Sequence, residues 1–406
     1  MSVTDNPPPR PVRAELRSAA RNGMPDQPGR LRRSLSGEPR QPVRAEPEGP
    51  DRSTETADST QSSAGALPLR RRDTSGGGRS DGGALRDARG RGDRDGPCFH
   101  LDVPPDGYAW WYVDGISDDG KRAISVIGFI GSVFSPWYAW SGRRDPENHV
   151  CLNVGTYGPG GRFTMTDRGR AALRTARDSF QVGPSSMRWT GSELAIDIDE
   201  VSGPPVISRV RGQVRLRPSG ITSVELPLTP DGAHVWRPFA PICEISVDLD
   251  APGWRWNGHG YFDANFGTRA LEADFDFWTW GRFPARDGAT VIYDADRRDG
   301  THLSRAFRFT PDGHAEQTEA PPRVGFRRSL WQVRRETRAD PGTVPRQSLN
   351  MLDAPFYSRS TVTTRLNGEE VTGVHEALDL RRFRSALLKP MLAVRVPRRA
   401  GWHWPD

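Results

Sequence analysis

Residues 110–130 read WWYVDGISDDGKRAISVIGFI, and this segment gives the clearest indication of the fold class. Two runs of aromatic and β-branched residues, 110–115 and 123–130, flank the segment Ser-Asp-Asp-Gly at 117–120. Aromatic and β-branched side chains favour strands, and a polar break with glycine between two such runs is typical of a β-hairpin. The stretch therefore predicts two antiparallel strands joined by a tight turn.

Similar short runs recur along the chain, separated by turns rich in Pro and Gly such as residues 157–161. Several runs alternate apolar with polar residues, which is the period of a half-buried strand. Helical periodicity is scarce, and the short helix candidates are residues 168–176, 268–275 and 376–383. We expect an all-β fold of the sandwich or barrel class. Because about 300 residues exceed one ordinary barrel, we expect two β-domains, at residues 98–240 and 241–399.

Residues 1–97 differ from the rest in composition. They contain 18 Arg, 14 Asp or Glu and many Pro, Gly and Ser, but no Phe, Trp, Tyr or Cys. Without large apolar side chains a segment cannot offset its ordering entropy, so we predict a disordered extension. This extension carries +4 of the formal net charge of +6. The remaining residues are nearly balanced in charge, which does not favour a nucleic-acid-binding face.

The cysteines and the chain termini bear on the compartment. Cys98, Cys151 and Cys243 are widely spaced and do not match the spacing of zinc ligands. They indicate thiols in a reducing compartment. The first residues lack the apolar stretch of a signal peptide, and no run of about 18 apolar residues occurs. We therefore expect a cytoplasmic protein without a metal site.

Two clusters about thirty residues apart combine titratable groups with aromatic rings. They are the segments 234–239, His-Val-Trp-Arg-Pro-Phe, and 259–265, His-Gly-Tyr-Phe-Asp-Ala-Asn. A carboxylic acid in apolar surroundings resists ionisation, because a bare charge is poorly solvated there. An acid that stays neutral can protonate an alkene, and nearby π-faces can stabilise the resulting cation. The clusters predict acid chemistry on an apolar substrate, at the junction of the two expected domains.

In five longer motifs the chain resembles the carotenoid 1,2-hydratase family, also called hydroxyneurosporene synthase. The motifs are residues 110–117, 133–144, 234–241, 258–267 and 279–283. The resemblance extends from about Cys98 to Arg399 and implies a pair of lipocalin-like β-barrels. It also implies a hydro-lyase that adds water to the terminal C1=C2 bond of acyclic carotenoids of the neurosporene or lycopene type. The resemblance implies no redox or metal cofactor, and a place in carotenoid biosynthesis of the spheroidene and spirilloxanthin type.

The resemblance implies that Asp263 is the catalytic acid and that His234, Trp236 and Tyr261 complete the site. Protonation at C2 would leave a tertiary cation at C1 for water to capture. With the ordinary carboxyl pKa near 4, Asp263 would be ionised. We therefore expect its pKa to be raised by burial beside the aromatic rings. His234 could orient the water, accept its proton or hold Asp263 neutral, and the sequence does not choose among these roles.

Two other interpretations concern single residues. His259 precedes Asp263 by four residues, so strand alternation would place both on one face and make His259 a further polar group of the site. Asp114 lies close to the turn at 117–120 and is interpreted as a turn residue.

The substrate and the rival functions set further expectations. A lipocalin-like protein that carries a carotenoid or another lipid without changing it would have the same aromatic lining, and a cyclase or isomerase could use the same acid. A bilayer-soluble substrate also implies peripheral association with the inner, photosynthetic membrane. The segment 402–404, Trp-His-Trp, with Arg398 and Arg399 before it, is either a lipid anchor or an ordinary chain end.

Overall fold

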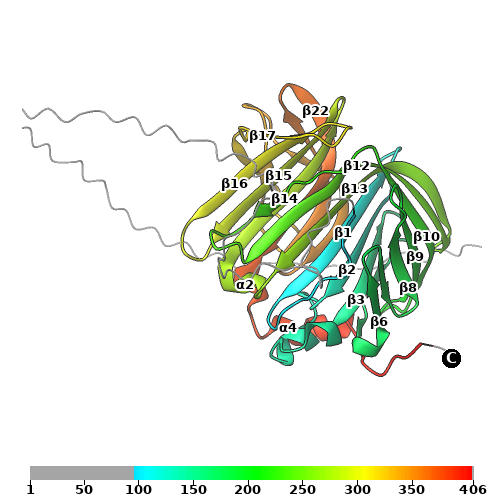
Figure 1. Cartoon of the computed structure of the whole chain (residues 1–406). Coiled ribbons are helices and arrows are strands. Elements are labelled where there is room, and N and C mark those ends of the chain that lie inside the picture. Colours follow the sequence, from blue (N-terminus) through cyan, green and yellow to red (C-terminus); the bar gives the residue numbers. More distant parts are fainter. Residues whose placement is uncertain (1–95, 405–406) are drawn as a thin grey trace, which may run out of the picture. The chain divides into compact units, whose positions relative to one another are not determined.

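The computed structural model describes residues 96–404, and the predicted extension at 1–97 lies almost entirely outside the described residues. Strands dominate these residues and form two large sheets (Figure 1). The first sheet has 14 strands in the order β23-β5-β3-β2-β1-β13-β12-β10-β9-β8-β7-β6, with β4 paired to β3 and β11 paired to β12. Its strands are β1 (Tyr108–Ser117), β2 (Ala123–Ile130), β3 (Val150–Tyr157), β4 (Phe163–Thr164), β5 (Asp167–Arg168), β6 (Leu173–Ala176), β7 (Ser179–Val182), β8 (Ser185–Trp189), β9 (Leu194–Val201), β10 (Arg209–Pro218), β11 (Leu226–Pro227), β12 (His234–Ala251), β13 (Trp254–Gly267) and β23 (Arg398–Arg399).

The second sheet has seven strands in the order β17-β16-β15-β14-β22-β21-β20, and β18 and β19 form a separate pair. These strands are β14 (Phe275–Ala285), β15 (Gly288–Arg297), β16 (His302–Phe309), β17 (Ala315–Thr318), β18 (Arg323–Phe326), β19 (Arg335–Arg338), β20 (Arg346–Ala354), β21 (Tyr357–Leu366) and β22 (Glu369–Asp379). The helices are short: α1 (Pro136–Trp140), α2 (Leu271–Asp274), α3 (Leu380–Phe383), α4 (Leu388–Arg395) and the 3-10 turns η1 (Pro146–Asn148) and η2 (Arg170–Ala172).

Strand β1 shows how one sheet serves two cores. All of its residues are buried, because both of its faces are covered. Ala109, Trp111 and Val113 point into a core that the first sheet encloses with its own strands. Their neighbours Tyr108, Trp110 and Tyr112 point the other way, into a second core shared with the other sheet. Alternation along an extended strand separates the two sets.

The shared core is the more aromatic of the two and lies between the sheets. Tyr112 and Trp236 enter it from the first sheet, and Trp278, Trp280 and Tyr293 enter it from the second. The polar side chains of β12 and β13 that face this core are therefore surrounded by rings from both sheets.

The structure confirms the all-β prediction and the hairpin at 110–130. Strands β1 and β2 pair antiparallel from Ala109–Ile130 to Ile116–Ala123, with the polar segment as their turn. Two closed lipocalin-like barrels are not confirmed. Among residues 96–404 no pairing joins the edge strands of either large sheet, so both sheets are open.

The domain boundary expected between residues 240 and 241 falls inside strand β12. Pro238 and Pro241 lie where the pairing of β12 with β13 shifts register, between Arg237 and Ala240 and again between Ala240 and Cys243. Proline lacks an N–H and is found in strands at such irregularities. The strand continues through both shifts, and the chain changes sheet only later, between β13 and β14.

The helix candidates had mixed outcomes. The candidates at 268–275 and 376–383 contain α2 and α3, whereas 168–176 holds only the turn η2 between strands β5 and β6. Helices α1 and α4 have no counterpart among the helix candidates. Both are short and lie on the surface at one end of the strands, and α4 is labelled there (Figure 1).

Candidate active site

Strands β1, β13 and β12 run side by side and bring the two sequence clusters together. Asn265 pairs with Trp110 of β1 on one side and with Trp236 of β12 on the other. One step along β13 on the same face, Asp263 lies opposite Tyr112. Regular alternation in β13 puts Tyr261 on this face as well. The face forms one wall of the shared aromatic core.

The Asp263 carboxyl is held by both aromatic residues that the sequence predicted beside it. Trp236 Nε1 donates to Oδ2 at 2.8 Å, and the Tyr261 hydroxyl donates to the same oxygen at 2.9 Å. Trp236 and Tyr261 are fully buried, and Asp263 is 3% exposed. The other oxygen, Oδ1, has a long contact of 3.5 Å from Asn265 Nδ2.

Asp263 differs from the other buried acids in having no cationic partner. The buried carboxylates of Asp114, Asp167, Glu200 and Asp294 each form a salt bridge with an arginine: Arg282, Arg398, Arg168 and Arg338, respectively. Within residues 96–404, no Lys, Arg or His nitrogen lies within 4.0 Å of the Asp263 carboxyl.

Burial therefore dominates the ionisation of Asp263. Loss of solvation raises the pKa of Asp263 well above its ordinary value, and the nearby carboxylates of Glu376 and Asp114 add to the shift. The hydrogen bonds from Trp236 and Tyr261 favour the charged form but do not offset the cost of burial. The predicted neutral acid in an aromatic environment is thus consistent with the site's geometry.

Rings from the second sheet close the site from the opposite side. The Tyr293 ring lies 5.6 Å from that of Trp236, and the Trp280 ring lies 5.1 Å from that of Tyr261, measured between centroids. Phe307 lies 6.0 Å from Trp236. Their π-faces supply the surroundings that stabilise a cation when water is excluded.

Two buried polar atoms at this face have no hydrogen-bond partner among the described residues. They are Asn265 Oδ1, beside Asp263, and Trp280 Nε1, beside Tyr261. Most buried polar atoms in proteins are hydrogen-bonded, so these two mark places that favour a polar ligand atom. Asn265 belongs to the motif at 258–267, but nothing in the sequence indicates a role for it.

His234 lies on the same face but away from the acid. It pairs with Gly267, four residues from Asp263, which corresponds to about 13 Å along a strand. Its Nε2 contacts Asp274 Oδ2 at 2.7 Å and its Nδ1 contacts the Tyr108 hydroxyl at 2.8 Å. Because both ring nitrogens are occupied, this geometry does not support the predicted role of holding Asp263 neutral.

The partners of His234 indicate a structural role for this residue. Asp274 also accepts hydrogen bonds from Arg269 and ends helix α2. The Tyr108 hydroxyl contacts the other ring nitrogen, Nδ1. His234 thus ties the start of β12 to α2 and to β1. The sequence offered no signal for Tyr108 or Asp274 as its partners.

His259 belongs to a second polar cluster further along β13. Its Nδ1 accepts from Arg282 Nη1 at 2.8 Å, and Arg282 also binds Asp114. Burial lowers the pKa of His259 to about 3, and the Arg282 charge adds to the effect. The expected shared face with Asp263 is confirmed by the unbroken pairing of β13 with β1, but its contacts are with Arg282.

The turn interpretation of Asp114 is wrong. Asp114 lies within β1, is fully buried, and accepts from the Tyr112 hydroxyl at 2.9 Å. Its carboxylate pairs with Arg282 of β14, so this ion pair joins the two sheets next to the candidate site. Nothing in the local sequence indicates a partner 168 residues away.

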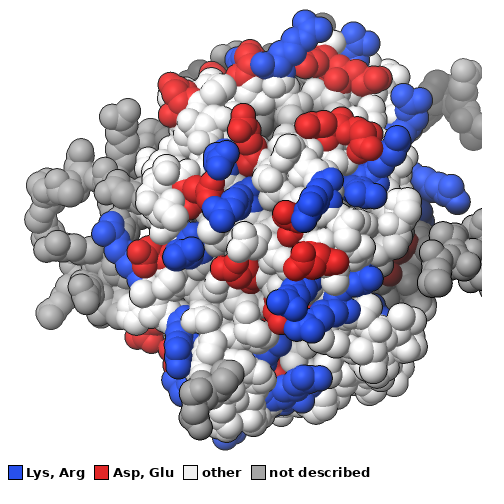
Figure 2. Space-filling view, turned by 90° about the vertical axis from the view of Figure 1, so that its right-hand side faces the viewer, with Lys and Arg blue, Asp and Glu red and all other residues white. Residues whose placement is uncertain are grey.

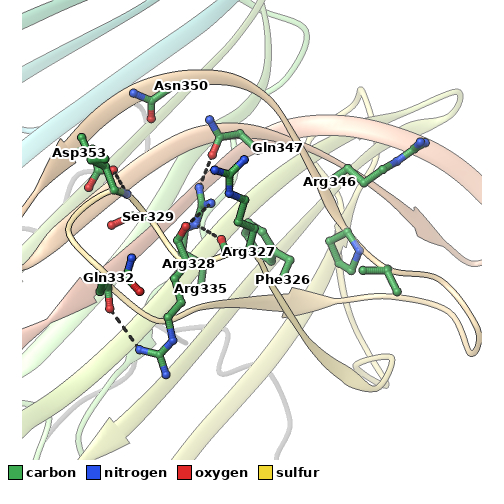
Figure 3. Close-up of a pocket in the computed structure, with 13 residues that line it drawn as sticks. Phe326, Arg327, Arg328, Ser329, Gln332, Arg335, Arg346, Gln347, Asn350 and Asp353 are labelled. Carbon is green, nitrogen blue, oxygen red and sulfur yellow. Dashed lines mark hydrogen bonds between the residues drawn. The ribbon is translucent and has the colours of Figure 1, made fainter. Parts of the chain in front are cut away.

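A pocket of about 870 Å³ lies elsewhere, beside β18 and β20 (Figure 3). None of its lining residues belongs to the candidate site, and four of the thirteen are arginines. Within residues 96–404, no group of three or more His, Cys, Asp or Glu side chains is arranged to bind a metal ion. No helix in that range combines the length and apolar character needed to cross a bilayer.

Comparison with known proteins assigns the family. The sequence profile described as Carotenoid hydratase CrtC matches residues 126–405. The acyclic carotenoid 1,2-hydratase of Cereibacter sphaeroides is 64% identical over 277 residues, covering 68% of this chain and 99% of that protein. The protein of the same name from Thiocapsa roseopersicina is 43% identical over 378 residues, covering 92% and 93%.

Among solved structures, kievitone hydratase from Nectria haematococca matches with a TM-score of 0.41 and 10% identity. The match covers 68% of this chain and 90% of that one. The family profile and the two sequence relatives agree over most of the described residues, so this chain belongs to the carotenoid hydratase CrtC family.

Proposed function

We propose that this protein is a hydro-lyase that adds water to the terminal C1=C2 bond of an acyclic carotenoid, without a cofactor. Membership of the hydratase family and the names of its relatives support the substrate class. One observation carries the chemistry: Asp263 is buried without a cationic partner, in contact with two aromatic donors.

The two donors indicate which oxygen carries the acidic proton. An indole N–H can only donate, so Asp263 Oδ2 must accept from Trp236, and it accepts from Tyr261 as well. The proton of the neutral acid is therefore assigned to Oδ1. Transfer of this proton to C2 forms a C–H bond, breaks the π-bond and leaves a tertiary cation at C1.

The same contacts favour the transition state over the ground state. As Asp263 becomes a carboxylate, its hydrogen bonds from Trp236 and Tyr261 become charge-assisted and stronger. The rings around the site stabilise the cation at the same moment, by an amount of about 2 kcal/mol or more when water is excluded. Burial keeps the proton on the acid until substrate arrives.

Water capture completes the cycle. A water molecule held by Asn265 Oδ1 would lie beside Asp263 Oδ1, because Asn265 Nδ2 is 3.5 Å from that oxygen. Its oxygen bonds to C1, and its surplus proton passes to Asp263 Oδ1, which restores the acid. The net reaction is alkene plus water giving a tertiary alcohol. The apolar substrate also supports peripheral association with the membrane that supplies it.

The test is a product assay with purified full-length protein and lycopene or neurosporene in heavy-oxygen water. We expect a tertiary alcohol that carries the heavy oxygen, and at least about 10²-fold less product with Asp263→Asn, the scale of general-acid catalysis. A carrier protein would return unchanged carotenoid, and a cyclase or isomerase would give an unlabelled product. Substantial hydration by Asp263→Asn would overturn the assignment of the acid.

A further inference from the structure

The large apolar side chains that are exposed to solvent gather at one end of the molecule. Nine are exposed among residues 96–404, and eight of them belong to α1, to α4 and the residue before it, or to two loops bonded to α3 and α4. These eight are Trp140, Val206, Ile207, Leu330, Trp331, Leu387, Met391 and Val394. We call them the apolar end. Scattered exposed apolar residues are ordinary, but a gathered set marks an interaction site.

Helix α4 forms the centre of the apolar end. Leu387, Met391 and Val394 have the spacing of a single helical face, and they are 88%, 40% and 53% exposed. On an adjacent side of the helix, Leu388 and Leu392 pack against the aromatic core between the sheets. The outward face is thus apolar where a helix bathed in water would be polar.

Specific contacts hold the other members next to the helices. Trp137 Nε1, in the helix that carries Trp140, donates to the carbonyl of Val396 at 2.7 Å. Arg395 donates to the carbonyl of Pro204, at the start of the loop that carries Val206 and Ile207. Arg382 of α3 donates to the Trp331 carbonyl at 2.8 Å. These contacts tie the segments that carry the eight side chains to α3, α4 and the residues that follow α4.

Cations surround this surface in excess. Residues 380–399 contain seven Lys or Arg and no Asp or Glu. Asp276 pairs with Arg381 and Arg384, Asp379 with Arg382, and Asp167 with Arg398. For the remaining three, no carboxylate lies within salt-bridge distance among the described residues. Lys389 is buried with its ammonium over the Phe383 ring, so Arg395 and Arg399 are the two that are exposed at this surface.

The pocket of Figure 3 adjoins the apolar end, because Leu330 is one of its lining residues. Its arginines add to the excess of positive charge there. Arg327, Arg328, Arg335 and Arg346 line it against one acid, Asp353. Arg335 is 3% exposed, and its contacts are with the carbonyls of Arg327 and Arg328 and with Gln347, not with a carboxylate. The strands β8–β10 contrast with this end: there, basic and acidic side chains alternate and pair (Figure 2).

We propose that the apolar end is the surface by which this protein docks on a bilayer that contains anionic lipids. A surface with exposed Trp, Leu, Met and Val side chains beside unpaired cations favours binding at the interface of such a bilayer. The inner side of α4 contacts the core that holds Trp236 and Tyr261. Docking would therefore bring the bilayer to the apolar interior that contains Asp263. This last step rests on the proposed function, whereas docking itself does not.

The test is vesicle co-sedimentation of the full-length protein without carotenoid, with phosphatidylglycerol–phosphatidylcholine vesicles. The variant Leu387→Glu/Met391→Glu changes two exposed side chains of the apolar end. The control Ala176→Glu/Gln317→Glu adds two glutamates at exposed positions on β6 and β17. We expect the first variant to lower the partition coefficient at least tenfold and the control to change it less than twofold.

Equal binding by wild type and the Leu387→Glu/Met391→Glu variant would overturn the proposal. So would a wild-type dimer, seen by gel filtration without vesicle binding, that this variant disrupts, because the surface would then be a self-contact. Hydration of detergent-solubilised carotenoid should be the same in all three proteins. If wild type binds vesicles but yields no alcohol in detergent, the proposed function fails and the docking surface stands.

Discussion

At the scale of single residues, Asp263 differs from the other buried acids in having no cationic partner. Four other buried acids are neutralised by arginine, and Asp263 instead accepts hydrogen bonds from Trp236 and Tyr261. A group in this position is protonated in the folded protein at pH values where the unfolded chain has released its proton. Its ionisation should therefore leave a signature in stability as well as in catalysis.

That signature is a difference in the free energy of unfolding between wild type and Asp263→Asn that changes with pH. Below about pH 4, both the folded and unfolded states of wild type hold the Asp263 proton. Above that, the unfolded state releases it while the folded state does not, so wild type loses stability until the pH passes the folded pKa. We expect the variant to gain about 1.4 kcal/mol relative to wild type per pH unit in this window. Urea unfolding from pH 4 to 7 measures the difference, and a flat difference would contradict the raised pKa.

Asn265 makes a separate prediction about the fate of the cation. In Asn265→Leu the water is no longer held, so hydration should fall by about 10²-fold, the cost of a misplaced reactant. Proton transfer by Asp263 continues, and the cation returns a proton instead of gaining water. Mass spectrometry of carotenoid recovered from deuterated water should then show deuterium in unreacted substrate.

The matched control for that experiment is Asp263→Asn, which should give neither alcohol nor deuterium uptake. If alcohol and deuterium uptake fall together in Asn265→Leu, Asn265 is a packing residue and its assigned role is wrong.

At the scale of elements, the site depends on how β1, β13 and β14 are held together. Arg282 of β14 binds Asp114 of β1 and the His259 ring of β13. Asp114 and His259 lie on the face that carries Asp263, and Arg282 reaches them from the opposite sheet. Arg359 of β21 acts similarly nearby, pairing with Glu376 and donating to Ser125 of β2 at 2.6 Å. These buried arginines fix the distance between the sheets and so the space around the acid.

Removal of one partner of the Arg282–Asp114 pair should be costly. Arg282→Met leaves a buried carboxylate without a cation and should lower the free energy of unfolding by about 3–5 kcal/mol. Adding Asp114→Asn removes that charge while keeping an acceptor for Tyr112, so the double variant should recover more than about 1 kcal/mol. Thermal or urea unfolding of the four proteins measures the coupling. Simple additivity of the two single effects would show that the ion pair does not join the sheets energetically.

The elements also show what the sequence could predict. Local patterns sufficed for the β1–β2 hairpin. They did not predict that the two aromatic clusters lie on paired strands, β12 and β13, because the clusters were expected in separate domains. They failed where the partner is distant: Asp114 was read as a turn residue because Arg282 lies 168 positions away. Nor did they indicate that β12 continues through residues 240 and 241, because its pairing with β13 is not encoded locally. The role of His234 at the acid is implied by the family resemblance, and its contacts with Tyr108 and Asp274 have no signal in either cluster.

At the scale of the whole molecule, charge and apolar surface are unevenly distributed. The strand face of Figure 2 mixes both signs, whereas the apolar end combines unpaired cations with exposed apolar side chains. Binding to anionic vesicles should thus have a part that depends on salt and a part that does not. As the Debye length shortens from about 10 Å at 0.1 M to about 3 Å at 1 M salt, the electrostatic part is screened.

We therefore expect co-sedimentation with anionic vesicles to weaken several-fold between low and high salt without disappearing. Uncharged phosphatidylcholine vesicles should show weak binding that is insensitive to salt. Complete loss of binding at high salt would mean that the apolar side chains contribute nothing.

The central claim is that Asp263 keeps its proton in the folded protein at neutral pH. Infrared difference spectroscopy of wild type minus Asp263→Asn, in buffer at pH 7, observes that proton directly. We expect a carbonyl stretching band of a protonated carboxyl group in wild type that the variant lacks. A difference spectrum with only carboxylate bands at this pH would contradict it.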